Sequence, residues 1–141
     1  MVESCLRTTA KQLLGHATIT RSESQREVQL ADLILIDLAN EGLKLGESTP
    51  CIIMTMRQGK QNQHGKVEYI GCIRNADSVL CPLSALAFYF FYRWGRNGAL
   101  EFPSFRQPED YYGLFVFPGD IRMPIRPLSY STQFKWNRKM F

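Results

Sequence analysis

The spacing of hydrophobic positions predicts that the chain begins with a helix. Thr8–Ile19 places apolar side chains at helical spacing. One face of this helix is therefore expected to pack on the core through Leu13, Leu14 and Ala17.

A second helix is predicted to begin at Ser22. Ser22 and Gln25 have the spacing of a capping box, in which two side chains satisfy free backbone N–H groups at a helix start. The apolar residues that follow are expected to direct the end of this helix toward the core: Val28, Leu30 and Leu33.

The middle of the chain has the shorter period of β-strands. Leu33–Leu38 is expected to form a short strand. Cys51–Arg57 and Lys66–Arg74 are expected to pair as a hairpin, because β-branched and aromatic residues partly alternate along them. Residues 58–65 lie between these strands and make a long, polar tip with a glycine near each end.

A dense apolar segment begins at Cys81. Pro82 suits the first turn of a helix, which is predicted to extend to Arg96 and to stop at the glycines around it. The uncharged part is much shorter than the ~20 residues that cross a bilayer, so a core helix is expected and not a membrane anchor. Its aromatic residues are expected in the core and not on a base-stacking surface: Phe88, Tyr89, Phe90, Phe91, Tyr92 and Trp94.

The chain ends in an amphipathic helical pattern that begins near Tyr130 and includes Phe134, Arg138 and Phe141. No cap or stop signal ends this pattern, so the sequence is expected to be one domain over residues 1–141 that is truncated at its C-terminus. Two interpretations stay open for the basic residues of the two later helices, phosphate contacts or solvated helix faces: Arg93, Arg96, Lys135, Arg138 and Lys139.

The composition fits one folded domain. With 141 residues, of which 45% are hydrophobic and 21% charged, the chain can bury one sizeable core. A formal net charge of +4 and a pI near 9.0 are compatible with an acidic partner such as nucleic acid. The cysteines form no C-x-x-C pair and are expected to be reduced thiols of the cytosol or nucleus: Cys5, Cys51, Cys72 and Cys81.

The hairpin tip and its flanks concentrate basic side chains. Against one acid, Glu68, they carry Arg57, Lys60, His64, Lys66 and Arg74. Together with the amides of residues 58–63, this is the mixture that proteins use to contact phosphate and sugar. On composition alone, the alternative stays open that these charges only keep an exposed strand edge soluble.

Two other kinds of site do not fit. A nucleotide-binding P-loop needs G-x-x-x-x-G-K-[ST], but five residues separate Gly59 from Gly65, and Val67 stands where a hydroxyl residue is required. The two histidines, His16 and His64, have no ligand at the usual close spacing, so no metal site is expected, and no cofactor is expected.

The stretch TRSESQREVQLADL, residues 20–33, resembles the first motif of tyrosine recombinases. In that motif an arginine opens a helix, a carboxylate follows within a few residues, and an aspartate ends the segment. Here these residues are Arg21, Glu23 and Asp32. The next feature of that family is a β-hairpin with a lysine after a glycine, and RQGKQNQHGK supplies Gly59 and Lys60.

A fungal branch is more similar. RQGKQNQHGKVEYIGCIRN followed by CPLSALAFYFFYRWG looks like the recombinase-like second domain of the fungal centromere-binding kinetochore subunit. That domain is itself similar to the recombinases of Crypton mobile elements. The resemblance covers about His16 to Phe141. It implies a nuclear protein with an α+β fold, mostly helical with a small antiparallel sheet and a long hairpin, like an incomplete tyrosine-recombinase catalytic domain.

The resemblance also implies DNA binding. In active relatives the first arginine holds the scissile phosphate and the hairpin lysine is the general acid for the leaving sugar oxygen; these positions correspond to Arg21 and Lys60. A guanidinium can bind two phosphate oxygens at once, and a lysine with a lowered pKa can donate a proton. The alternative for Arg21 is a helix-entry residue in a surface ion pair with Glu23 or Asp32.

Catalysis by this chain is not expected. Active recombinases also need a His-x-x-Arg box and a tyrosine nucleophile downstream of the helix near Tyr130, and the sequence holds neither there. The leading hypothesis is a non-catalytic domain that binds double-stranded DNA through Arg21, Arg57, Lys60, His64 and Lys66. The alternatives are the N-terminal part of an active mobile-element recombinase, and a protein-interaction module without a DNA role. The sequence leaves open whether the protein forms a homodimer.

Overall fold

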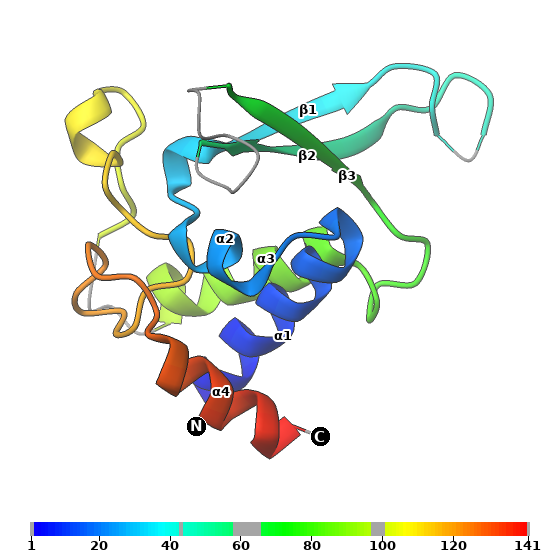
Figure 1. Cartoon of the computed structure of the whole chain (residues 1–141). Coiled ribbons are helices and arrows are strands. Elements are labelled where there is room, and N and C mark those ends of the chain that lie inside the picture. Colours follow the sequence, from blue (N-terminus) through cyan, green and yellow to red (C-terminus); the bar gives the residue numbers. More distant parts are fainter. Residues whose placement is uncertain (1, 43, 58–65, 97–100, 141) are drawn as a thin grey trace.

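A small antiparallel sheet lies on one side of three helices, and the C-terminal helix lies on the other side (Figure 1). The structure is a computed structural model that describes residues 2–42, 44–57, 66–96 and 101–140. The helices are α1 (Val2–Thr18), α2 (Ser22–Glu27), α3 (Pro82–Phe90) and α4 (Tyr130–Met140). The strands are β1 (Leu33–Leu38), β2 (Thr49–Met56) and β3 (Glu68–Ile73). The α+β class predicted from the sequence is confirmed.

The sheet has the order β1-β2-β3, with β2 in the centre and antiparallel neighbours on both sides. Met54 of β2 pairs with Leu33 on one side and with Ile70 on the other. Directly paired residues point to the same face of a sheet, so these three side chains share the face that holds the buried Met54. The strand predictions at all three places are confirmed.

The core fills the space between this face of the sheet and helices α1 and α3. It consists of side chains from every part of the chain: Ala10, Leu14, Val28, Leu30, Met54, Leu86, Tyr89, Val116 and Phe117. The last two come from the apolar run that precedes Pro118. This run is held by backbone hydrogen bonds to residues just after α2, with Val116 N–H donating to the Val28 carbonyl at 2.9 Å. These hydrogen bonds connect the segment after α2 with the segment before Pro118.

Helix α1 is longer than predicted, and its buried face only partly matches the predicted one: Leu14 is in the core as predicted, whereas Leu13 is only partly buried. It begins at Val2, and its buried positions include the charged residues Arg7 and Lys11. Arg7 Nη1 donates to the carbonyls of Pro118 and Gly119 at 2.7 and 2.9 Å. Ala17, which was expected on the inner face, is exposed. A search for apolar spacing could not find this face, because two of its largest side chains are cations.

The helix that begins at Pro82 also departs from the prediction. It changes from α to π geometry at Phe91, and this π-helix, η2 (Phe91–Arg96), brings Arg93 into the core. Arg93 is fully buried and donates to the carbonyls of Phe115 and Val116, so its suggested role as a phosphate contact is wrong. The expectation that all the aromatic residues here are in the core is also wrong for Phe88 and Phe91, which are exposed.

Two further sequence-based expectations can be compared with the fold. Within the described residues, no helix is both long and apolar enough to span a bilayer. The cysteines are free thiols, and Cys51, Cys72 and Cys81 are buried. Burial, together with the neighbouring Cys51 and Cys81, raises the pKa of the Cys72 thiol to about 11, so this thiol stays protonated and unreactive near neutral pH.

Candidate nucleic-acid interface

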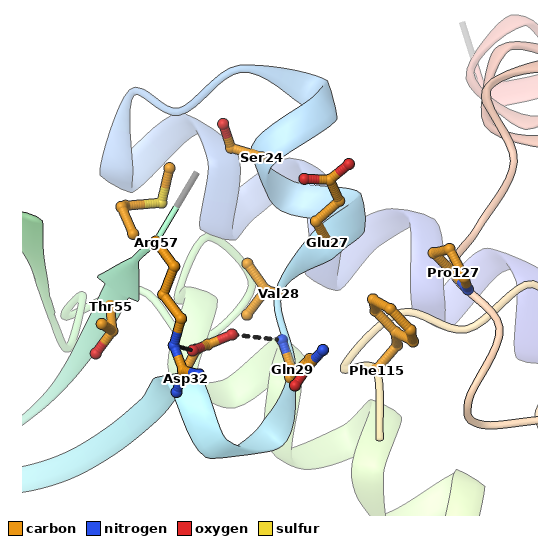
Figure 2. Close-up of a pocket in the computed structure, with 10 residues that line it drawn as sticks. Ser24, Glu27, Val28, Gln29, Asp32, Thr55, Arg57, Phe115 and Pro127 are labelled. Atoms are coloured by element: carbon orange, nitrogen blue, oxygen red, sulfur yellow. Dashed lines mark hydrogen bonds and ion pairs between the residues drawn. The ribbon is translucent and has the colours of Figure 1, made fainter. Parts of the chain in front are cut away.

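The end of β2 and the segment around α2 meet at a pocket of about 360 Å³ (Figure 2). The segment after α2 includes a single 3-10 turn, η1 (Leu30–Asp32), which leads directly into β1. The pocket is lined from α2 by Ser24 and Glu27, from the end of β2 by Thr55 and Arg57, and from the loop before α4 by Phe115 and Pro127. Two of the segments that line it, the one after α2 and the one at the end of β2, are separate in the sequence and are in contact here.

Asp32 is the centre of this contact. Its carboxylate is buried, and one oxygen, Oδ2, accepts a hydrogen bond of 3.0 Å from the backbone N–H of Gln29. The other oxygen, Oδ1, lies 2.7 Å from Nε of Arg57 in an ion pair (Figure 2). A buried carboxylate needs such partners, because leaving its charge uncompensated away from water is costly. The hydrogen bond from the Gln29 N–H stabilises the turn, and the ion pair fixes the position of the Arg57 side chain.

Arg57 is held at Nε by the ion pair, while much of its side chain is exposed to solvent. Its side chain remains 57% exposed although Nε is paired with Asp32. A guanidinium has five N–H donors in a planar fork. Among the described residues, no hydrogen bond from the terminal nitrogens of Arg57 accompanies the Nε contact. With respect to the described residues, these nitrogens are available to bind an anion at the loop end of the hairpin.

Helix α2 is held against α1 by a buried amide. Gln25 donates from Nε2 to the Thr20 carbonyl at 2.8 Å and accepts from Lys11 Nζ at 3.1 Å. The amide fits there because residue 15 of α1 is a glycine, whose missing side chain leaves the space that Gln25 fills. The capping box predicted for Ser22 and Gln25 is wrong, because Gln25 turns inward to α1 instead of back to the helix start.

Arg21 is the N-cap residue of α2. Its backbone is extended, with φ −69° and ψ 149°, and its side chain is exposed and makes no capping hydrogen bond. Within the part of the chain that the structure describes, Arg21 forms no ion pair with Glu23 or Asp32, and the carboxylate of Asp32 is instead paired with Arg57. The guanidinium of Arg21 therefore faces solvent at the exposed start of the helix whose later residues line the pocket.

The remaining predicted contacts lie on the hairpin. Lys66 is exposed just before β3. Lys60 and His64 fall in residues 58–65, outside the described residues. Within the described ranges, no three His, Cys, Asp or Glu side chains come close enough to hold a metal ion. The candidate interface thus consists of basic side chains around α2 and at the loop end of the hairpin.

Sequence reasoning missed one contact and one residue of this site. Asp32 was assigned to the first motif, but nothing in the sequence identified Arg57 as its partner. Lys11 of α1 donates a hydrogen bond to Gln25 of α2. It was not predicted as part of the site, because a lysine in a helix usually faces solvent. Burial and the nearby Arg26 lower the pKa of Lys11 to about 8. The only sequence signal for the burial of Lys11 was its spacing of four residues from Arg7 and from Gly15, which places the three residues on one face of the helix.

Comparison with known proteins gives one match. A protein-family model matches residues 2–141, and its description is centromere DNA-binding protein complex CBF3 subunit, domain 2. No curated protein and no solved structure matches the chain significantly. The match covers both the segment around α2 and the hairpin, the two parts that meet at the Asp32–Arg57 contact.

Proposed function

Since the chain belongs to the family of domain 2 of the CBF3 centromere DNA-binding subunit, we propose that it binds double-stranded DNA through the phosphate backbone. Subunits of a centromere complex are nuclear, in agreement with the reduced cysteines. The observation that supports the proposal most directly is the Asp32–Arg57 ion pair. It holds a half-exposed guanidinium at the loop end of a hairpin that is itself basic.

The geometry of Arg57 suits a phosphate. Because Nε is paired with Asp32, the side chain loses little further conformational freedom when its terminal nitrogens bind a phosphate oxygen. Two further basic side chains are exposed. Arg21 lies at the start of α2, and Lys66 lies just before β3. Phosphate contacts of this kind fix the position of a protein on a duplex and carry no sequence information themselves.

In this proposal the domain is recombinase-like but does not cut DNA. Lys60 and His64 are contacts at the hairpin tip, and Arg21 holds a phosphate as the matching arginine does in active recombinases. Residues 1–141 contain no His-x-x-Arg motif, so the proposal assigns binding and no cleavage step to these residues. The fold over residues 1–141 is accordingly proposed to act as one DNA-binding domain.

Salt-dependent binding to duplex DNA tests this function. Fluorescence anisotropy with two duplexes of unrelated sequence, between about 50 and 200 mM salt, should give affinities that fall steeply and similarly with salt, because bound phosphates release counterions. Arg21→Ala and Lys60→Ala should each lower the slope of log K against log salt by roughly one unit on both duplexes. Absent binding at low salt, or binding that does not weaken as salt rises, would favour the protein-interaction module instead.

A further inference from the structure

Two stacked aromatic rings with an arginine at each end join α2 to α4. The guanidinium of Arg26, near the end of α2, lies over the ring of Tyr130 at 5.6 Å. Tyr130 stacks on Phe134 with ring centroids 6.2 Å apart and planes 20° apart, and Arg138 lies over the ring of Phe134 at 6.0 Å. Residues 130, 134 and 138 are spaced four apart, so they follow one another along one face of α4.

This stack faces solvent. Tyr130 and Phe134 are 64% and 52% exposed, which is unusual for two rings that lie next to each other on a helix. Arg138 and Lys135 are exposed beside them. If the rings served only the stability of the fold, they would be expected to turn toward the core. Gln133 occupies that inward position instead.

The stack carries two positive charges, on the guanidinium groups of Arg26 and Arg138. Residues 130–140 include no acid. Within the described residues, neither Arg26 nor Arg138 forms an ion pair, and Nε of Arg26 is buried without a hydrogen-bond partner. Behind Arg26 lies a further cation, the buried Lys11 of α1, whose pKa Arg26 helps to lower. An anion bound at the stack would relieve this repulsion.

We propose that Arg26, Tyr130, Phe134 and Arg138, together with Lys135, form a second phosphate-binding surface for the same DNA duplex. This inference rests on the proposed function and extends it to α4. A guanidinium stacked on a ring keeps the N–H donors at its edge free, and the ring limits its motion. The two rings therefore position two arginines to bind phosphates, and Tyr130 and Phe134 are positioning residues.

Continuity with the first site favours DNA over a separate acidic partner. Pro127, three residues before Tyr130, lines the same pocket as Asp32 and Arg57 (Figure 2). Glu27, next to Arg26, lines the same pocket. The stack therefore begins at the edge of the first site and leads away from it along α4. A duplex carries phosphates every 3.4 Å along each strand, so one duplex can supply both surfaces.

The test separates the charges from the rings. Binding of a duplex of about 20 base pairs is measured against salt for the whole chain and for Arg26→Gln, Arg138→Gln and Phe134→Leu. Each arginine variant should lower the salt slope by roughly one unit, because one phosphate contact is lost. Phe134→Leu should weaken binding but leave the slope unchanged, because Arg138 keeps its charge and loses only its position. Arg138→Lys should likewise keep the slope and lose affinity.

Controls keep the outcome interpretable. Arg74→Gln removes an exposed charge beyond the far end of β3 and should change neither quantity. Thermal unfolding followed by circular dichroism checks that each variant is folded. One outcome is that the wild type binds DNA, that a variant of a hairpin residue binds it more weakly, and that both arginine variants of the stack bind it as the wild type does. In that case the proposal of a second surface is wrong and the proposed function stands. If the wild type shows no salt-dependent binding, both proposals fail.

Discussion

Nε of Arg57 lies 2.7 Å from Oδ1 of Asp32, and this ion pair connects the end of β2 with the turn that leads into β1. Asp32 is buried and also accepts the backbone N–H of Gln29, so its position is fixed by the turn. The direction of Arg57 is in turn fixed by Asp32. The arginine at the loop end of the hairpin is thus positioned by the same segment that carries Arg21.

A double-mutant cycle measures this contact. Arg57→Ala and Asp32→Asn should each lower the free energy of unfolding by about 1 kcal/mol, a modest value because Arg57 is half exposed. Asp32→Asn is preferred to alanine because its side-chain oxygen can still accept the Gln29 N–H. In chemical denaturation the double variant should be little worse than either single variant, with a coupling energy of about 1 kcal/mol. Strictly additive effects would show that the two side chains do not interact.

Gly15→Ala should displace Gln25. A Cβ at residue 15 would overlap with the Gln25 side-chain amide, which would then lose its hydrogen bonds with Lys11 and Thr20. We expect a net loss of about 1 kcal/mol in unfolding free energy, although alanine is itself the better helix former by a similar amount. In a Gln25→Ala background the same substitution should become stabilising. If Gly15→Ala stabilises both backgrounds, the close packing of α2 on α1 is wrong.

Ile19→Gly should stabilise the protein. Ile19 follows the end of α1 with φ of 52°, in the left-handed region, and its side chain is 92% exposed. A β-branched residue is strained there and glycine is not, so removing the strain should raise the unfolding free energy by about 1 kcal/mol, visible as a higher Tm. Ile19→Ala serves as the control, because it removes the same exposed surface and remains strained. Equal melting temperatures for the two variants would contradict this assignment.

Lys11 should make stability depend on pH in the alkaline range. Burial, and next the charge of Arg26 on α2, lower its pKa from 10.5 to about 8. Below about pH 8 both the folded and the unfolded chain hold this proton, and the cost of burying the charge is fully present. Between about pH 8 and 10.5 the unfolded chain binds more protons, so this group makes the fold more stable as pH rises.

Lys11→Met isolates that effect. The stability of the variant relative to the wild type should be highest near pH 7 and should decline as pH rises through 8 toward 10, as measured by urea denaturation across this range. Loss of the hydrogen bond to Gln25 shifts the whole curve but does not change with pH. A difference that is constant from pH 7 to 10 would show that Lys11 keeps an ordinary pKa.

Local patterns predicted the elements better than their contacts. The strands and the helix starts at Pro82 and Tyr130 follow from alternation, proline placement and amphipathic spacing, and the structure confirms them. The predicted start of α2 at Ser22 is also confirmed, although the capping box from which it was predicted does not form. The inner face of α1 could not be predicted in this way, because Arg7 and Lys11 are buried through partners that are distant in the sequence, such as the carbonyl of Pro118. The change to a π-helix at Phe91 has the same origin, since it serves the contacts of Arg93 with Phe115 and Val116.

The candidate site was predictable in part for a similar reason. The exposure of Arg21 and Lys66 agrees with the roles expected for them, whereas Lys60 and His64 lie outside the described residues. The Asp32–Arg57 pair could not be found from spacing, because it joins residues on separate elements whose relative position depends on the whole core. Likewise, the stack on α4 depends on Arg26 of α2, which no pattern within α4 reveals.

The most direct test of the central claim compares two arginines at opposite ends of the hairpin strands. Arg57 follows β2 at the loop end of the hairpin, and Arg74 follows β3 at its open end; both are exposed. Duplex binding is measured against salt for Arg57→Gln and Arg74→Gln. We expect Arg57→Gln to lower the salt slope by roughly one unit and Arg74→Gln to leave it unchanged. Equal slopes for both variants and the wild type would contradict a phosphate contact at Arg57.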